Sequence, residues 1–209
     1  MTVGVAVLLS LPALLATLGG QTKAPPSSPD LSARKSLGMP KAPITIEVFA
    51  DFQCPTCRTF FMTTTQQLIP DYVSTGKVYL VHYDFPLSMH SNSRQAARWA
   101  NAAALAGKFE AAERALYEKQ DTWAPTGQIE QVLAGVLSPA DMKKVRELAT
   151  AQSSQIDAAI QKDLALGNAR NVNGTPTIFV LHRGERTLLP QGGVNYPLLK
   201  QYLDYLLAH

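Results

Sequence analysis

The stretch DFQCPTCRTFF, residues 51–61, contains both cysteines of this 209-residue chain, Cys54 and Cys57. Two cysteines at this spacing can form a redox couple, supply half of a metal site, or close a short structural disulfide. The sequence around the pair determines which of these alternatives is favoured.

A buried strand is predicted before the cysteine pair and a helix after it. PITIEVFADF (43–52) reads as a strand, and the apolar positions from Cys57 to about Val73 fit a helix that Pro70 would kink or end early. KVYLVHYDF (77–85) is a second strand. Strand, helix and strand in this order predict a βαβ unit with parallel strands and a right-handed crossover.

The rest of the chain predicts a helical insertion followed by a return to the sheet. Helices are expected over 91–124 with a break near Gly107, over 126–137, after an N-cap at Ser138, and over 153–169. A hairpin of strands at 177–182 and 186–192 and a closing helix at 196–209 follow. The predicted fold class is therefore α/β, in three layers, with an inserted helical subdomain.

The first 40 residues differ from the rest of the chain. No charged side chain precedes Lys23, and residues 3–18 are almost wholly apolar, so residues 1–20 are expected to be a signal peptide or an N-terminal membrane anchor. Residues 21–40 carry four prolines and four serines and are expected to be a flexible linker. The folded unit should then start near Lys41, outside the cytoplasm, in the periplasm or cell envelope.

Composition excludes one class of partner. Hydrophobic residues make up 46% of the chain and charged residues 17%, as in an ordinary globular protein, and the formal net charge is +3. The closest basic cluster is Lys143, Lys144 and Arg146, which reads as a solvated helix face. No nucleic-acid partner is expected.

Cys54 is expected where the first strand has ended and the helix begins. Backbone N–H groups of the first helical turn then point toward its sulfur and, with the helix dipole, favour the thiolate. Pro55 suits the first turn, where its missing N–H would have had no partner. Cys57 lies one turn further on, so we expect Cys54 to be the nucleophile and Cys57 the resolving thiol. Their redox-active disulfide would need no other cofactor.

The other two explanations of the cysteine pair fit less well. A structural metal site usually takes about four Cys or His ligands, and the histidines are not paired at ligand spacing: His82, His90, His182 and His209. A disulfide across so short a loop would constrain the unfolded chain little. We expect no bound metal, and a non-enzymatic metal- or peptide-binding module is the alternative from another functional class.

GTPT (174–177) directly precedes the third predicted strand. Through this segment and FADFQCPTC, YDFPLSMH, AARWANAAALAGKFEAAERALYEKQDTW and NGTPTIFV, the chain resembles the DsbA-like branch of the thioredoxin superfamily. The resemblance covers roughly residues 41–209. It implies a thioredoxin-like fold, with a central mixed sheet flanked by helices and a helical insertion at about residues 87–172. It also implies a protein thiol:disulfide oxidoreductase.

The resemblance further implies roles for individual residues. Pro176 is expected to be a cis-proline that faces the cysteine pair, and the Thr175 backbone to pair with an extended substrate peptide. Phe52 and the helical insertion would border the substrate groove. His90 falls where relatives often have histidine, and we expect it to act in helix entry or packing.

Two positions depart from the family pattern. Many relatives carry a buried acid six residues before the first cysteine, where this chain has Val48, and strand alternation should aim Glu47 at the other face. Asp51 is therefore the candidate for proton transfer, although it can instead cap the helix. Thr56 stands where strongly oxidising members have histidine. We therefore expect a milder oxidant, with a Cys54 pKa not below about 4.

These residues predict an enzyme that exchanges disulfides with cysteine-containing protein substrates, with the oxidase direction preferred. A substrate thiolate would attack Cys54, and a membrane redox partner would restore the disulfide. The opposite direction, a disulfide reductase, uses the same atoms and depends on the reduction potential. The linker is too short to hold a dimerisation domain, so we expect a monomer.

Overall fold

The computed structural model describes residues 1, 31–191 and 194–209. Its centre is a five-stranded sheet with the order β1-β3-β2-β4-β5, in which β2 runs parallel to β3 and all other neighbours are antiparallel. The strands are β1 (Ser36–Leu37), β2 (Ile44–Ala50), β3 (Val78–Asp84), β4 (Thr177–His182) and β5 (Glu185–Leu188). This mixed sheet and the helices around it confirm the expected fold class.

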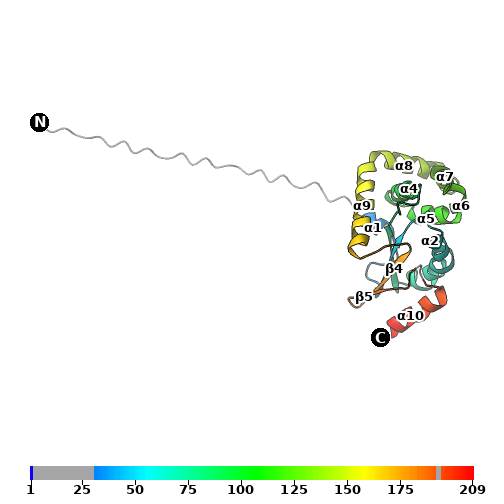
Figure 1. Cartoon of the computed structure of the whole chain (residues 1–209), viewed down its shortest axis with the longest axis vertical. Helices are drawn as coiled ribbons and strands as arrows, with labels where there is room; N and C mark the ends of the chain where they lie inside the picture. Colours follow the sequence, from blue (N-terminus) through cyan, green and yellow to red (C-terminus); the bar gives the residue numbers. More distant parts are fainter. Residues whose placement is uncertain (2–30, 192–193) are drawn as a thin grey trace.

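Helices cover the sheet, and most of them come from the insertion between β3 and β4. Figure 1 shows these inserted helices grouped at one end of the molecule and the closing helix at the other end. The inserted helices are α4 (Ser93–Leu105), α5 (Phe109–Glu118), α6 (Gln120–Trp123), α7 (Ile129–Ala134), α8 (Pro139–Ala151) and α9 (Ser153–Ala169), and the closing helix is α10 (Tyr196–Ala208). They agree with the predicted insertion at about residues 87–172.

Two helix boundaries follow from the residues that were expected to make them. Gly107, between α4 and α5, has a φ of +74°, a backbone conformation that glycine adopts without steric cost. The Ser138 hydroxyl accepts a hydrogen bond from the Asp141 N–H and caps α8.

The helix that begins after Cys54 runs without a break as far as Val73. It consists of α2 (Pro55–Phe60), the π-helical η1 (Phe61–Thr65), α3 (Gln66–Leu68) and the π-helical η2 (Ile69–Val73). Pro70 was expected to kink the helix or end it early, but it lies in the first turn of η2, where helical residues continue. The wider π turn accommodates the missing N–H of proline.

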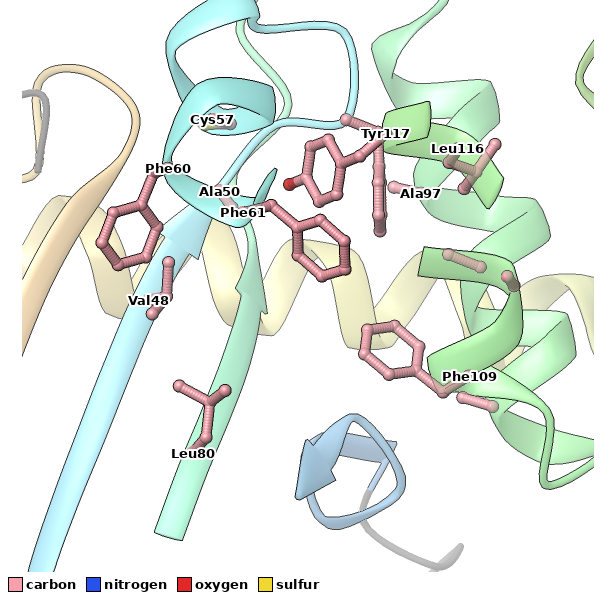
Figure 2. Packing of buried hydrophobic residues seen from close by; sticks show 14 of the residues in the cluster. Val48, Ala50, Cys57, Phe60, Phe61, Leu80, Ala97, Phe109, Leu116 and Tyr117 are labelled. Carbon is pink, nitrogen blue, oxygen red and sulfur yellow. The ribbon is translucent and has the colours of Figure 1, made fainter. Parts of the chain in front are cut away.

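A hydrophobic core joins the insertion to the helix that carries the cysteines. Phe61 of this helix stacks on Tyr117 of α5, with ring centroids 4.8 Å apart, and Figure 2 shows the two rings side by side. Trp123 is fully buried and its indole N–H donates to the Leu116 carbonyl at 2.7 Å. The insertion is thus fixed against the start of α2, which positions the site.

The expected linker boundary at residue 40 is wrong. Leu31 is buried in α1 (Leu31–Arg34), and β1 adds a short strand to the sheet edge. Lys35 is 1% exposed, forms an ion pair with Asp84, and lies 2.6 Å from Asp163. The folded unit therefore includes residues from Leu31 onward. The expected signal peptide or anchor and the first part of the linker fall mostly on residues 2–30, which lie outside the described residues.

None of the helices in the described part of the chain is long and apolar enough to cross a membrane.

Candidate active site

Cys54 occupies the N-cap position of α2, four residues after β2 ends. Its backbone is extended, with φ −74° and ψ 121°, and Pro55 follows in the first turn. The Cys54 N–H donates to the Asp51 carbonyl at 3.1 Å, which fixes the loop between strand and helix. Both cysteines are free and buried, whereas Pro55 and Thr56 are exposed. The expected strand-to-helix junction therefore holds Cys54 at the start of a helix.

The two thiols have opposite acid–base properties. A hydrogen bond from Cys57 is the largest of the causes that lower the pKa of Cys54 to about 5, and the nearby Thr175 side chain and the backbone N–H groups of Cys57 and Thr56 lower it further. Burial instead raises the pKa of Cys57 well above its ordinary value, and the nearby Cys54 thiolate adds to this. At neutral pH Cys54 is thus a thiolate and Cys57 a thiol. The value for Cys54 is above the limit of about 4 inferred from Thr56.

Thr175 and Pro176 lie against the cysteine pair, although 121 residues separate Thr175 from Cys54. The Thr175–Pro176 peptide bond is cis, as the resemblance implies. The Cys54 sulfur lies 3.4 Å from the Thr175 carbonyl oxygen. Pro176 is buried and lines the same small cavity as Cys57. The Thr175 hydroxyl, which the sequence did not single out, is buried and has no hydrogen-bond partner among the described residues.

The Asp51 carboxylate is 1% exposed and accepts four hydrogen bonds. The donors are Gln53 N–H at 2.7 Å, Leu87 N–H at 2.9 Å, Ser93 Oγ at 2.6 Å and His90 Nδ1 at 2.7 Å. The carboxylate does not cap α2, which has no side-chain cap. Asp51 instead ties the loop before α4 to the active-site loop, and only its backbone N–H approaches Cys57 Sγ, at 3.5 Å.

The expectation that Phe52 borders an open substrate groove is wrong. Phe52 is 1% exposed; its ring stacks on His82 with centroids 5.1 Å apart, and the Tyr117 ring lies tilted against it at 5.2 Å. The Gln120 side-chain amide donates to the Phe52 carbonyl at 2.7 Å and to the Cys54 carbonyl at 3.0 Å. These contacts turn the Phe52 ring inward, toward the insertion.

Val48 and Glu47 lie on opposite faces of β2, as strand alternation requires. Glu47 binds Arg170 at 2.7 Å and Arg186 at 3.3 Å, away from the cysteines. Val48 lines the cavity beside Cys57. No acid therefore occupies that strand position on the cysteine side.

Ionisable residues that were not predicted as site residues also line the same cavity. They include Lys35, Tyr117, His82 of β3, which pairs with Val48 across the parallel strands, and Glu113 of α5. The strand register predicts that His82 shares a face with Val48, so this contact could have been found from sequence. Glu113 could not, because its position depends on how α5 packs against the sheet.

In the described part of the chain, no three His, Cys, Asp or Glu side chains are grouped as metal ligands would be. His82 is committed to carboxylates, His90 to Asp51, and His209 to the Tyr205 carbonyl. The structure therefore gives no support to the metal-binding alternative.

Comparison with known proteins gives matches that agree with this geometry. A thioredoxin family model matches residues 32–187. The probable disulfide bond formation protein D of Bacillus anthracis is 28% identical over 154 residues, which span 71% of this chain and 70% of that protein.

Two solved structures share the fold. The crystal structure of oxidised BdbD from Bacillus subtilis has a TM-score of 0.65 at 21% identity, over 84% of this chain and 93% of that one. A thioredoxin-like oxidoreductase from Silicibacter pomeroyi has a TM-score of 0.61 at 26% identity, over 88% and 99% of the two chains.

Proposed function

Because this chain belongs to the thioredoxin family, as a DsbA-like thiol:disulfide oxidoreductase, we propose that it introduces disulfides into cysteine-containing protein substrates outside the cytoplasm. Cys54 and Cys57 form its redox-active disulfide around the Pro55–Thr56 dipeptide, and no further cofactor takes part. The protein acts as a monomer and is reoxidised by a membrane redox partner.

The contrast between the two thiols carries this proposal. A thiol with a pKa of about 5 ionises readily and is a good leaving group in disulfide exchange. A buried thiol whose pKa is raised stays protonated until it reacts. Cys54 therefore exchanges with substrates, and Cys57 opens or closes the internal disulfide.

In the oxidase direction, a substrate thiolate attacks Cys54 Sγ of the Cys54–Cys57 disulfide, and Cys57 leaves and takes up a proton. A second substrate thiolate then attacks the substrate sulfur of the mixed disulfide and releases the Cys54 thiolate. The substrate has lost two electrons and gained a disulfide, while both cysteines of the enzyme are reduced. The partner then removes the two electrons and restores the Cys54–Cys57 disulfide.

The substrate chain is proposed to lie against Thr175 and Pro176. The Thr175 carbonyl is 3.4 Å from Cys54 Sγ, so a peptide that pairs with the Thr175 backbone would bring its own cysteine to the reacting sulfur. Pro55 and Thr56, both exposed, form the opposite side of this approach.

Three observations support the oxidase direction and the location outside the cytoplasm. Stabilising the Cys54 thiolate stabilises the reduced enzyme, which favours electron flow from substrate to enzyme. The apolar run at residues 3–18 supports export or membrane attachment. The B. anthracis relative is itself named for disulfide bond formation.

The reduction potential of the full chain, measured by equilibration with glutathione buffers, tests the direction. We expect a value between about −120 and −180 mV, the range of oxidases and isomerases. A value near about −270 mV would instead make the protein a reductase. A Cys54→Ser variant should lose all thiol exchange yet keep peptide binding. Absence of a reversible two-electron couple in the wild type would refute the redox function altogether.

A further inference from the structure

A small, partly open cavity borders Cys57. About 20 Å³ of it is open to the centre of a water molecule, which is room for one water. Its wall includes Cys57, Val48 and Pro176 near the active site and His82, Glu113 and Tyr117 toward the insertion. Figure 2 shows Val48 and Phe61 beside the helix of Cys57, with the Tyr117 hydroxyl directed toward that helix. Cys57 thus lines the same cavity as several ionisable groups.

His82 and Glu113 form a buried pair at this cavity. His82 Nδ1 lies 3.0 Å from a Glu113 carboxylate oxygen, and both residues are less than 10% exposed. His82 Nε2 is 3.4 Å from Asp84 Oδ1, without the geometry of a hydrogen bond. Burial alone would lower the pKa of His82, but its contacts with Asp84 and Glu113 outweigh this and raise it to about 9.

The pair belongs to a buried cluster that carries one negative charge too many. The other members are Lys35, which also lines the cavity, and the two carboxylates that it contacts: Lys35 pairs with Asp84 and lies 2.6 Å from Asp163. With His82 protonated, the cluster has two cations, Lys35 and His82, and three carboxylates, Asp84, Asp163 and Glu113. An unbalanced buried carboxylate is costly, and burial, together with the charge of Asp84, raises the pKa of Asp163.

We propose that Glu113, oriented by His82, receives the proton of Cys57 across this cavity when Cys57 closes the disulfide. The inference rests on the function proposed above. In this step the Cys57 S–H bond breaks and its proton passes to a Glu113 oxygen. The Cys57 thiolate attacks Cys54 Sγ of the mixed disulfide, the Cys54–Cys57 bond forms, and the second thiol leaves as a thiolate. In the oxidase direction, Cys57 regains its proton from Glu113.

The other ionisable groups near Cys57 are less suited to this step. The Asp51 carboxylate already accepts four hydrogen bonds. Burial, followed by the charges of Cys57 and Glu113, raises the pKa of Tyr117, which therefore stays a phenol and cannot accept the proton. Tyr117 lines the cavity together with Cys57 and Glu113. Asp84 and Asp163 are held by Lys35 on the far side of His82.

The test measures closure of the mixed disulfide between Cys54 and glutathione in the full chain. Oxidised protein is mixed with reduced glutathione, the reaction is quenched with acid, and mass spectrometry follows the mixed disulfide between pH 5.5 and 8. We expect little change of the wild-type closure rate with pH, because an internal base removes the Cys57 proton. In Glu113→Gln we expect closure to slow about a hundredfold near pH 6 and to rise about tenfold per pH unit.

Asp163→Asn is the matched control, because it removes one carboxylate from the same cluster without touching the cavity. It should change closure less than threefold, and Glu113→Asp should recover part of the loss. Alkylation of Cys54 should be similar in all variants, since it does not need the Cys57 proton.

Two results would overturn the proposal. One is a Glu113→Gln profile equal to the wild type, and the other is an equal loss in Asp163→Asn, which would indicate a general charge effect. If Glu113→Gln does not fold, the wild type alone decides: a closure rate that rises tenfold per pH unit would mean that solvent deprotonates Cys57. If the wild type forms no mixed disulfide at all, the proposed function itself fails, and this outcome is distinct from the others.

Discussion

The thiolate of Cys54 should make the stability of the reduced protein depend on pH in a way that the oxidised protein does not. In the folded, reduced chain the pKa of Cys54 is about 5, whereas an unfolded cysteine has a pKa of about 9. Between these values the unfolded state binds one more proton than the folded state. Raising the pH therefore stabilises the reduced fold, and the gain disappears as pH falls through about 5.

The size of this effect follows from the proton count. One proton corresponds to about 1.4 kcal/mol of unfolding free energy per pH unit. From pH 6 to pH 8 the reduced form should thus gain up to about 2.7 kcal/mol relative to the oxidised form. This is an upper limit, because water near the sulfur screens the interactions that lower the pKa. Cys57 adds little in this range, since it is a thiol in both states.

Urea unfolding of the reduced and oxidised proteins at pH 6, 7 and 8 measures the gap between their free energies of unfolding. In this gap, the contributions of groups whose surroundings do not change with redox state cancel. Reduced Cys54→Ser provides the control and should lack the slope. Thiolate absorbance of the reduced wild type should titrate with a midpoint near 5. A gap that stays constant within about 0.5 kcal/mol, together with a midpoint above 7, would refute the assignment of Cys54 as the stabilised thiolate.

Three further predictions concern the elements that support the site. Lys35→Met should lower the free energy of unfolding by about 3–5 kcal/mol at pH 7, because it leaves Asp84 and Asp163 buried without their cation. The loss should shrink to about 1.5 kcal/mol at pH 5, where one carboxylate takes up a proton. A loss that urea unfolding shows to be independent of pH would contradict this. Gln120→Met leaves two backbone carbonyls without their donor and should lower the free energy of unfolding by about 2 kcal/mol. Amide hydrogen exchange in the active-site loop should become faster, and unchanged exchange protection there would contradict the prediction. Gly167→Ala would place a methyl group 2.6 Å from a buried phenyl ring and should lower stability by about 1–3 kcal/mol, whereas a neutral thermal midpoint would mean that the ring can move.

The sequence was most informative where local chemistry determines the backbone. The strand before the cysteines, the Ser138 cap and the break at Gly107 depend on neighbouring residues, and the structure has them where they were predicted. The proline-containing helix was less predictable, since the π turns that accommodate Pro70 leave no pattern in the sequence.

Burial decided by distant contacts could not be predicted in the same way. Residues 31–40 look like a linker because one turn of helix and a two-residue strand are too short to show a period. Lys35 is held in place by Asp84 and Asp163, 49 and 128 residues away. The family resemblance implied that Phe52 borders a groove, but α5 and α6 contribute the contacts that turn it inward.

The wrong predictions for residues 31–40 and for Phe52 have one cause: the burial of these residues depends on contacts with distant parts of the chain. The active site is built from local and distant parts in the same way. The nucleophilic side of the site combines a local element, the end of a strand and the start of a helix, with the Thr175–Pro176 loop, which is 121 residues away in the sequence. The inner side belongs to the insertion, because Gln120 holds the Cys54 carbonyl and Glu113 reaches the cavity beside Cys57. The insertion is therefore not only a cover for the sheet. It supplies the buried polar groups that are absent at the strand position of Val48. A change in how α5 packs should therefore affect the reactivity of Cys57 more than that of Cys54.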